Sequence, residues 1–261
     1  MNLSFRRIYA VLLRNFYADK RSVMRITEMF YYPAIDITLW GLTTKWLRSG
    51  DTSGAVIALA TSLVLWQVTS RCIYDISVGM VEELWNRSMT NFFGSPLQLS
   101  EWMLANMLTS ICKLFIVLPY GALCVAITYG VNIFQLGWSL IPYILLLLGC
   151  GWTIGFLGAS VILFWGRQAQ STPWMIAWFF VPLCAVYYPL ASLPPAIRII
   201  SQCTPLAQTF EALRHHLLTG MPAYNNLLLA SGLMIAYLTL SMFLFTRTFK
   251  RTLRRGLASL E

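Results

Sequence analysis

Six stretches of mainly apolar residues recur along this chain, and each is close to the length that a helix needs to cross a membrane. They lie at 29–46, 55–81, 104–129, 136–165, 173–190 and 225–245. A spanning helix takes about 20 such residues, because the hydrocarbon core of a bilayer is about 30 Å thick and a helix rises about 1.5 Å per residue. The pattern predicts an all-α polytopic membrane protein with six transmembrane helices.

The amino-acid composition excludes an ordinary soluble domain. Only 11% of the 261 residues are charged and 57% are hydrophobic, and the mean hydropathy is +0.64. Soluble domains carry about 25% charged residues, because water must solvate their surface. We therefore expect the apolar stretches to contact lipid as well as one another.

The distribution of Lys and Arg predicts which side of the membrane each end occupies. With six spans, thirteen basic residues fall on the side of the two termini and four on the opposite side. Basic residues accumulate on the cytoplasmic side, so both termini are predicted to be cytoplasmic. The net charge of +9 follows from this topology, and no nucleic-acid partner is needed to explain it.

The segments before the first span and after the last span are basic. In 1–28, Phe5, Ile8, Leu12 and Phe16 recur at helical spacing among basic residues, which favours an amphipathic helix lying on an anionic lipid surface. The alternative is a cytosolic helix packed on a partner. Residues 248–261 are predicted to be a basic cytoplasmic tail.

Four ionisable residues lie within the predicted spans: Asp36, Arg71, Asp75 and Lys113. Such groups are costly in hydrocarbon and are expected to face protein or water. Counted from the cytoplasmic ends of their spans, all four have similar depths, and Arg71 and Asp75 share one helix face. We predict a paired polar layer that joins the first three spans. It would be either a structural lock or a cytoplasmic gate or substrate contact.

Two connections are longer than turns. The cytoplasmic connection at 82–101 has helical character and is interrupted at Gly94, Ser95 and Pro96. The outer connection at 190–221 is too polar to span and is broken by several prolines. It predicts short re-entrant helices that dip into the outer leaflet before the last span.

Motifs of enzyme chemistry are missing from the sequence. It contains no phosphate-binding GxxxxGK[ST] loop, no GxSxG and no HExxH. His215 and His216 are adjacent and cannot supply a metal site by themselves. Five of the six cysteines lie in apolar stretches and no CxxC occurs, so neither a metal nor a redox centre is indicated. We expect no enzyme activity and no cofactor bound by this chain.

The two connections carry a resemblance to a known family. Glu83-Leu84-Trp85-Asn86-Arg87-Ser88 followed by Phe93-Gly94-Ser95-Pro96-Leu97 resembles the membrane subunits of ABC-2 type transporters. So does the outer series Tyr188-Pro189-Leu190, Leu193-Pro194-Pro195, Thr204-Pro205-Leu206 and Arg214. The resemblance extends over nearly the whole chain and is nearer to the drug and lipo-oligosaccharide exporter branch.

This resemblance implies a single transmembrane domain over 1–261, with a six-span bundle at 29–247. The cytoplasmic connection would be a coupling helix that docks on a separate ATPase subunit. Its contacts would be Glu82, Glu83, Trp85, Asn86, Arg87, Phe93 and Pro96. The alternative for these residues is an ordinary solvated helix end. The outer segment, with Pro189, Pro194, Pro195, Pro205 and Arg214, would close the exit.

The function implied by the resemblance is that of an exporter permease in the inner (plasma) membrane. Two permease chains, identical or different, would form the path for an amphipathic drug, lipid or glycolipid, and the partner ATPase would bind ATP and Mg. Tyr31, Tyr32, Trp40 and Trp66 would line the path or belong to the aromatic belt at the lipid interface. The alternatives are a polysaccharide permease of the same family and a gradient-driven transporter or channel that acts without an ATPase.

Overall fold

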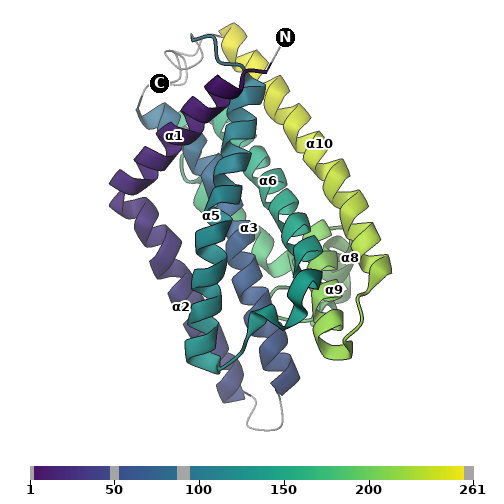
Figure 1. Ribbon diagram of the computed structural model, residues 1–261. Coiled ribbons are helices and arrows are strands. Elements are labelled where there is room, and N and C mark those ends of the chain that lie inside the picture. Colours follow the sequence, from purple (N-terminus) through teal and green to yellow (C-terminus); the bar gives the residue numbers. More distant parts are fainter. Residues whose placement is uncertain (1–2, 48–52, 87–94, 256–261) are drawn as a thin grey trace.

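The computed structural model describes residues 3–47, 53–86 and 95–255, and this part of the chain is helical with no strand (Figure 1). The long helices form an elongated bundle, and short helices fill one flank. The α-helices are α1 Phe5–Arg21, α2 Val23–Leu47, α3 Ser53–Trp85, α5 Leu99–Tyr129, α6 Leu140–Trp165, α7 Thr172–Phe180, α8 Pro195–Gln202, α9 Pro205–Thr219 and α10 Tyr224–Arg255. The 3-10 helices are η1 Ile133–Ser139, η2 Gly166–Ala169, η3 Val181–Leu183 and η4 Leu190–Ser192.

Four segments of the described chain are long and apolar enough to cross a membrane: Val56–Trp85, Leu99–Tyr129, Ile133–Ala169 and Tyr224–Arg254. The segments in α3 and α6 are mostly buried within the bundle, whereas those in α5 and α10 are mostly not covered by protein. Only 11% of the most apolar part of α10 and 22% of that of α5 are buried. Such surface is stable in lipid and costly in water. The prediction of an all-α chain is confirmed for the described residues, and four of the six predicted spans coincide with helices that are long and apolar enough to cross a membrane.

The first predicted span, 29–46, lies within α2, which has 25 residues and is more polar than the four long apolar segments. It contains Arg25, Glu28 and Asp36. It nevertheless runs the length of the bundle. Arg25 at its start contacts Glu82 at the end of α3, and Ile37 accepts a hydrogen bond of 2.8 Å from the hydroxyl of Tyr129 at the end of α5. α2 is therefore antiparallel to α3 and parallel to α5.

The fifth predicted span, 173–190, is not one helix. α7 ends at Phe180, η3 contains Pro182, and the chain turns at Ala185, whose φ is 54°. Proline has no N–H to donate and cannot continue a helical hydrogen-bond ladder. The apolar helical segment Thr172–Leu183 has 12 residues and extends about 18 Å, which is less than a bilayer core.

Helices α3 and α6 pack closely because glycines line their contact. A Cβ on Gly151 would lie 2.6 Å from the Cβ of Cys72 and 2.8 Å from the carbonyl oxygen of Thr69. One turn further along α6, the carbonyl of Gly155 accepts a hydrogen bond of 3.1 Å from Ser77. Small residues let the two backbones approach each other, as is common in membrane helix pairs.

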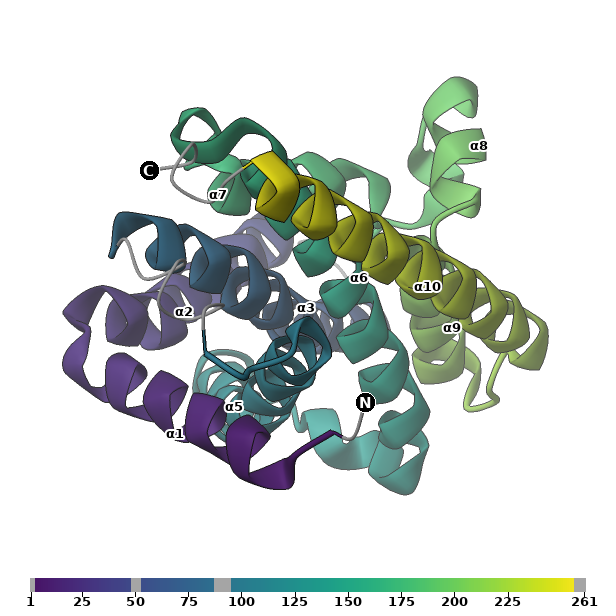
Figure 2. The same cartoon turned by 90° about the horizontal axis from the view of Figure 1, so that it is seen from above.

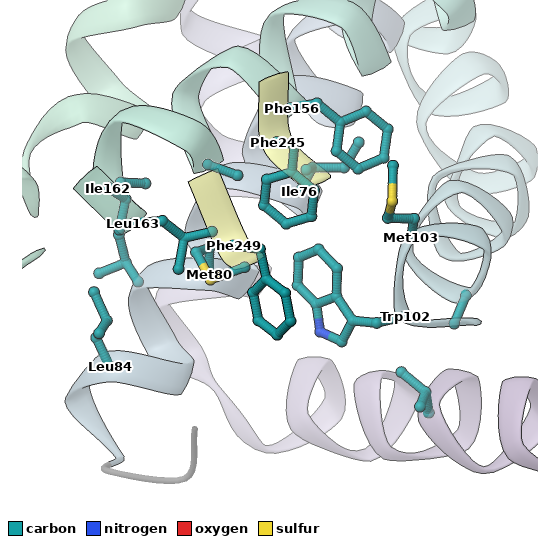
Figure 3. Close-up of a cluster of buried hydrophobic side chains, with 14 of the residues drawn as sticks. Ile76, Met80, Leu84, Trp102, Met103, Phe156, Ile162, Leu163, Phe245 and Phe249 are labelled. Carbon is teal, nitrogen blue, oxygen red and sulfur yellow. The ribbon is translucent and has the colours of Figure 1, made fainter. Parts of the chain in front are cut away.

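A cluster of large buried side chains fixes one end of the bundle (Figure 3). The rings of Trp102 and Phe156 lie against Phe245, with centroid distances of 5.7 and 5.5 Å. Ile8 and Val11 of α1 belong to the same cluster. This end also holds the start of α1, the end of α3, the start of α5 and the end of α10 (Figure 1).

Helix α1 differs from the expected interfacial helix, because one of its faces packs on the bundle. Asn15 donates to Asn106 and Thr109 of α5 at 3.2 and 3.3 Å. The apolar stripe expected from the sequence is divided between two environments. Ile8 is buried, whereas Phe5 and Phe16 are exposed.

Candidate functional site

The centre of the candidate site is an ion cluster between α3 and α5, close to the α1–α2 corner. Asp75 Oδ1 lies 3.1 Å from the Nη2 of Arg71 and 2.7 Å from the Nζ of Lys113. Lys113 also lies 2.8 Å from Asp19 of α1, and Arg71 lies 3.9 Å from Glu28 of α2. Three of the four residues of the predicted polar layer are therefore in one cluster.

Asp36 is the exception to the predicted layer. No ion pair is found between Asp36 and the basic residues of the described chain, and its contacts are with neutral groups. It accepts hydrogen bonds from the amide of Gln67 at 2.7 Å and from the hydroxyl of Tyr187 at 3.5 Å. The expected pairing of Asp36 with the layer is wrong in this structure, and Glu28 stands in its place beside Arg71.

The physical reason is where α2 begins. The sequence estimate counted depth from residue 29, whereas α2 begins at Val23. Glu28 and Asp36 are eight residues apart, which places Asp36 about 12 Å further along the helix. The sequence analysis missed Asp19, Arg25 and Glu28 because all three lie within 1–28, a range interpreted as surface helix. The presence of acidic residues in an otherwise basic segment was the sequence feature that could have indicated ion pairs within the chain.

A cavity of about 360 Å³ opens beside this cluster. Its walls come from α2, α3, α5 and α7, and its aromatic lining is Tyr32, Trp40, Trp66, Tyr74, Trp174 and Trp178. Its polar lining is Glu28, Asp36, Gln67, Ser70 and Arg71. Three of the four aromatic residues expected to line a path or a lipid belt, Tyr32, Trp40 and Trp66, are therefore on the cavity wall. A volume of this size is in the range of small-molecule sites.

A second, more polar cavity of about 200 Å³ lies on the other side of the cluster, between α1, α3 and α5. Asp75, Lys113, Glu82 and Glu83 all line it. The Oδ2 atom of Asp75 is buried and has no hydrogen-bond partner in the described structure. The cluster therefore separates an aromatic cavity from a charged one.

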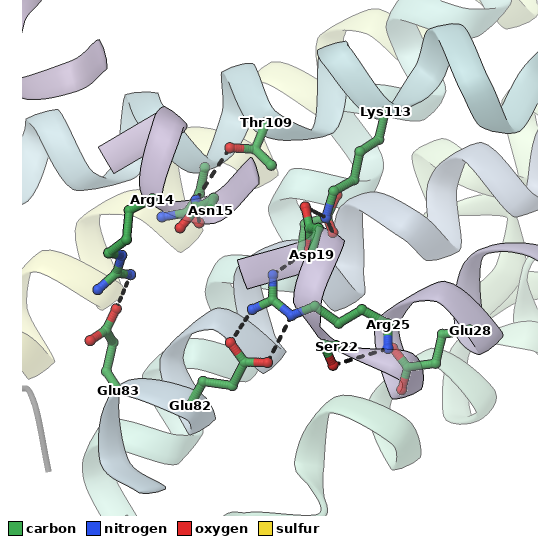
Figure 4. A network of polar contacts seen from close by, with 12 residues as sticks. Arg14, Asn15, Asp19, Ser22, Arg25, Glu28, Glu82, Glu83, Thr109 and Lys113 are labelled. Carbon is green, nitrogen blue, oxygen red and sulfur yellow. Dashed lines mark hydrogen bonds and ion pairs between the residues drawn. The ribbon is translucent and has the colours of Figure 1, made fainter. Parts of the chain in front are cut away.

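The end of α3 is tied to α1 and α2 by ion pairs (Figure 4). Arg25 lies between Glu82 and Asp19 and contacts both, and Arg14 contacts Glu83. Glu83 is buried, with 3% of its side chain exposed. In this structure Glu82 and Glu83, which were expected to contact an ATPase, make contacts within the chain.

Trp85, the last residue of α3, joins this end to the turn that precedes α7. Its indole N–H donates to Gln170 at 3.2 Å, and its ring stacks on Trp174 at 6.4 Å. Trp85 and Asn86 remain exposed. Two further residues of the expected coupling helix, Arg87 and Phe93, lie outside the described residues.

The chain resumes in a turn that contains Pro96 and leads into α5. The first turn of α5 is closed by a capping box between Gln98 and Glu101. Glu101 is fully buried and accepts hydrogen bonds from the guanidinium of Arg7 and from the backbone N–H of Ser4 at 2.8 Å. The N-terminal segment is thus fixed to the start of α5.

The outer segment contains short helices, as the sequence predicts. Pro189 and Pro194 precede η4 and α8, and Pro195 and Pro205 occupy the first positions of α8 and α9. Proline suits a first helical position because its missing N–H would have no partner there. Figure 2 shows α8 at the edge of the molecule and α9 beneath α10.

Arg214 on α9 fixes the turn that follows η3. It donates to Glu211 at 2.9 Å and to the carbonyl of Ala185 at 2.9 Å, and Glu211 accepts from the N–H of Leu190 at 3.3 Å. Burial lowers the pKa of Arg214, and the neighbouring Glu211 opposes that shift. The residue therefore holds the broken end of the fifth apolar stretch against α9.

The two adjacent histidines have different surroundings. His216 is buried, and its Nδ1 lies 3.1 Å from the hydroxyl of Tyr143, whereas His215 is exposed. Burial lowers the pKa of His216, and His215 adds to the shift. Within the described ranges no three His, Cys, Asp or Glu side chains are grouped so as to hold a metal ion.

Comparison with known proteins does not assign this arrangement to a family. No protein-family model matches the chain, and no curated protein matches it at a significant level.

Proposed function

We propose that this chain is the membrane permease subunit of an ATP-binding cassette exporter, of the ABC-2 type that its two connections resemble. It would move an amphipathic substrate outward, powered by a separate ATPase subunit that binds ATP and Mg. Two permease chains, identical or different, would enclose the path. The chain would lie in the inner (plasma) membrane with both termini in the cytoplasm.

One observation carries this proposal: the end of α3 is connected to α2 and α7, two of the helices that line the aromatic cavity. Arg25 links Glu82 to α2, and Trp85 links the same end to α7 through Trp174. The cavity itself is lined by α2, α3, α5 and α7. A displacement of the 87–94 connection by a docked ATPase would therefore move the cavity walls.

The proposal includes two spans beyond the four long apolar helices. α2 supports one of them, because it extends from the end of α3 to the end of α5 and would have to cross the same apolar layer. The broken segment from α7 to η4 would form the other crossing. In that arrangement α8 and α9 are the re-entrant helices of the outer leaflet.

The competing function is a gradient-driven transporter or channel. Its support is the ion cluster, in which Asp75 and Lys113 line a polar cavity and the Oδ2 atom of Asp75 is buried without a hydrogen-bond partner. Ionisable residues inside a membrane are commonly parts of ion or proton paths. A gradient-driven transporter needs no ATPase subunit, whereas the exporter does. The presence or absence of a bound ATPase therefore separates the two functions.

Purification of the tagged protein from its native membrane in mild detergent tests the proposal. We expect an ATPase subunit in stoichiometric amount. It should be lost from a variant carrying Arg87→Glu and Phe93→Ala and retained by Arg198→Glu, a matched charge reversal on the exposed helix α8. A folded wild-type protein that reproducibly brings no ATPase would contradict the exporter function and favour the gradient-driven one.

A further inference from the structure

The aromatic cavity has an excess of negative charge that the described chain does not neutralise. Glu28 and Asp36 line it, and Arg71 is its one cationic residue. The guanidinium of Arg71 makes its hydrogen bonds with Asp75, at 3.1 Å, and lies 3.9 Å from Glu28. Asp75 Oδ1 is shared between Arg71 and Lys113, so Arg71 supplies at most one positive charge against the two carboxylates of the cavity lining.

The wider cluster does not correct this imbalance. In the described part of the chain, the ion pairs that connect Arg71 to α1, α2 and α5 join four carboxylates and three cations: Asp19, Glu28, Asp75 and Glu82 against Arg25, Arg71 and Lys113. Asp36 adds a fifth carboxylate that is bonded only to neutral donors. Buried carboxylates are costly unless a cation or further hydrogen-bond donors compensate them.

Glu28 also points to a ligand, because Arg71, its ion-pair partner in the described chain, lies 3.9 Å from its Oε2 atom and makes no hydrogen bond with it. It is 91% buried, and its Oε1 atom accepts a hydrogen bond of 3.3 Å from the indole of Trp174. Its Oε2 atom is buried and has no hydrogen-bond partner within the described structure. Pro33, one turn along α2, also lacks the N–H that would bond the carbonyl of Met29, and both residues line the cavity.

The remaining walls suit the body of an organic cation. Trp40 stacks on Tyr187 at 4.3 Å, next to Asp36, and Trp66 and Tyr74 face the same space from α3. Aromatic faces attract cations, most strongly where water is excluded. About 12 Å separates the levels of Glu28 and Asp36 along α2, which is long enough for a molecule with a charged group and an apolar body.

Some residues of the cavity lining are also exposed on the surface of the described bundle. Tyr32 and Leu39 of α2 are each 60% exposed and Trp178 of α7 is 63% exposed, and all three line it. Both helices pack on α3, which also lines the cavity. Because these residues belong to the apolar surface of a membrane protein, a ligand dissolved in the lipid has direct access.

We propose that this cavity binds an amphipathic organic cation, with Asp36 as the main counter-charge and Glu28 as the second. Asp36 takes the main role because it has no cationic partner among the described residues. Glu28, in contrast, lies near Arg71, which also pairs with Asp75. The binding of the cation is independent of the proposed exporter. That the cation is the exported substrate rests on the proposed function.

Tetraphenylphosphonium binding to the purified, detergent-solubilised chain tests this, measured by equilibrium dialysis. The matched probe is tetraphenylborate, which has the same four phenyl groups and the opposite charge. We expect saturable binding of the cation, and Asp36→Asn should weaken it by about tenfold or more. Glu28→Gln should weaken it less, and the conservative Asp36→Glu should restore part of the loss. Glu211→Gln, which removes the same charge on α9 outside the cavity, should leave binding unchanged.

Three outcomes would overturn the cation site: no saturable binding to wild type, equal competition by tetraphenylborate, or unchanged affinity in Asp36→Asn. Ser70→Leu covers the case in which the charge variants fail to fold, because it reduces the cavity without altering charge and should also weaken binding. A failure of the proposed exporter function would give a different result. The purified protein would still bind the cation, but no ATPase subunit would copurify with it from the native membrane.

Discussion

Lys113 of α5 and Asp75 of α3 form an ion pair with a 2.7 Å contact between two of the longest apolar helices of the protein. Both side chains are at least 90% buried. The attraction between buried opposite charges is strong, and removing one partner leaves the other without compensation. The pair is therefore expected to fix the position of α3 relative to α5.

A double-mutant cycle measures this coupling. With Asp75→Asn and Lys113→Gln, unfolding in detergent should give a coupling free energy of about 1–3 kcal/mol, because the residues are in direct contact. The same cycle with Asp36→Asn and Arg71→Gln should give less than about 0.5 kcal/mol, since Asp36 is bonded to Gln67 instead. Equal coupling in the two cycles would contradict the arrangement of the cluster.

A single methyl group at Gly151 is expected to separate α3 from α6. Gly151→Ala would place a Cβ 2.6 Å from that of Cys72 and 2.8 Å from a backbone oxygen. Overpacking of this kind costs about 1–3 kcal/mol, and the thermal unfolding temperature in detergent should fall.

Gly232→Ala on α10 is the matched control for that variant. A Cβ at Gly232 meets no atom within 4 Å. Alanine is the better helix former by about 0.5–1 kcal/mol, so this variant should be neutral or slightly more stable. Equal effects of the two substitutions would show that the α3–α6 contact is looser than described.

Stability should fall in mild acid because of His216. Its folded-state pKa is lowered by burial, so the unfolded chain binds the proton more readily than the folded one. Its contribution is fully present above the unfolded pKa of about 6.5 and is lost as pH falls through the lower folded value. Unfolding temperatures measured from pH 8 to pH 5 should show this decline.

Substitution of each histidine in turn identifies the group responsible. In His216→Gln, the part of the fall in unfolding temperature that is due to His216 should disappear. In His215→Gln, which changes the exposed neighbour, most of it should remain. A decline of the same size in wild type and His216→Gln would assign the acid sensitivity to another group.

The number of spans can be tested by labelling intact cells with a membrane-impermeant maleimide. Cys203 is exposed in the outer segment and should react from outside. With six spans, Asn86→Cys in a Cys203→Ser background lies in the cytoplasm and should react only after the membrane is permeabilised. With only the four long apolar helices spanning, and a cytoplasmic N-terminus, residue 86 would be outside and would react in intact cells.

The helical class, the long apolar helices and the short outer helices were all predictable from local patterns of residues. Hydrophobic runs of bilayer length need all their backbone hydrogen bonds satisfied within the segment, and a helix does this locally. The effect of proline at the starts of α8 and α9 is also local, because proline restricts the backbone conformation of the residues beside it. The pairing of Arg71 with Asp75 was also predictable, since residues four apart share one helix face.

Which of the distant charges meet depends on how the helices pack in three dimensions. Glu28 rather than Asp36 lies beside Arg71, because the start of α2 and its position against α3 set the register between the helices. Helix packing also brings Glu82 and Glu83 into contact with Arg25 and Arg14. These two arginines lie more than 50 residues earlier in the chain. Contacts between distant segments depend on how whole helices pack, and helical periodicity along one chain segment does not contain that information.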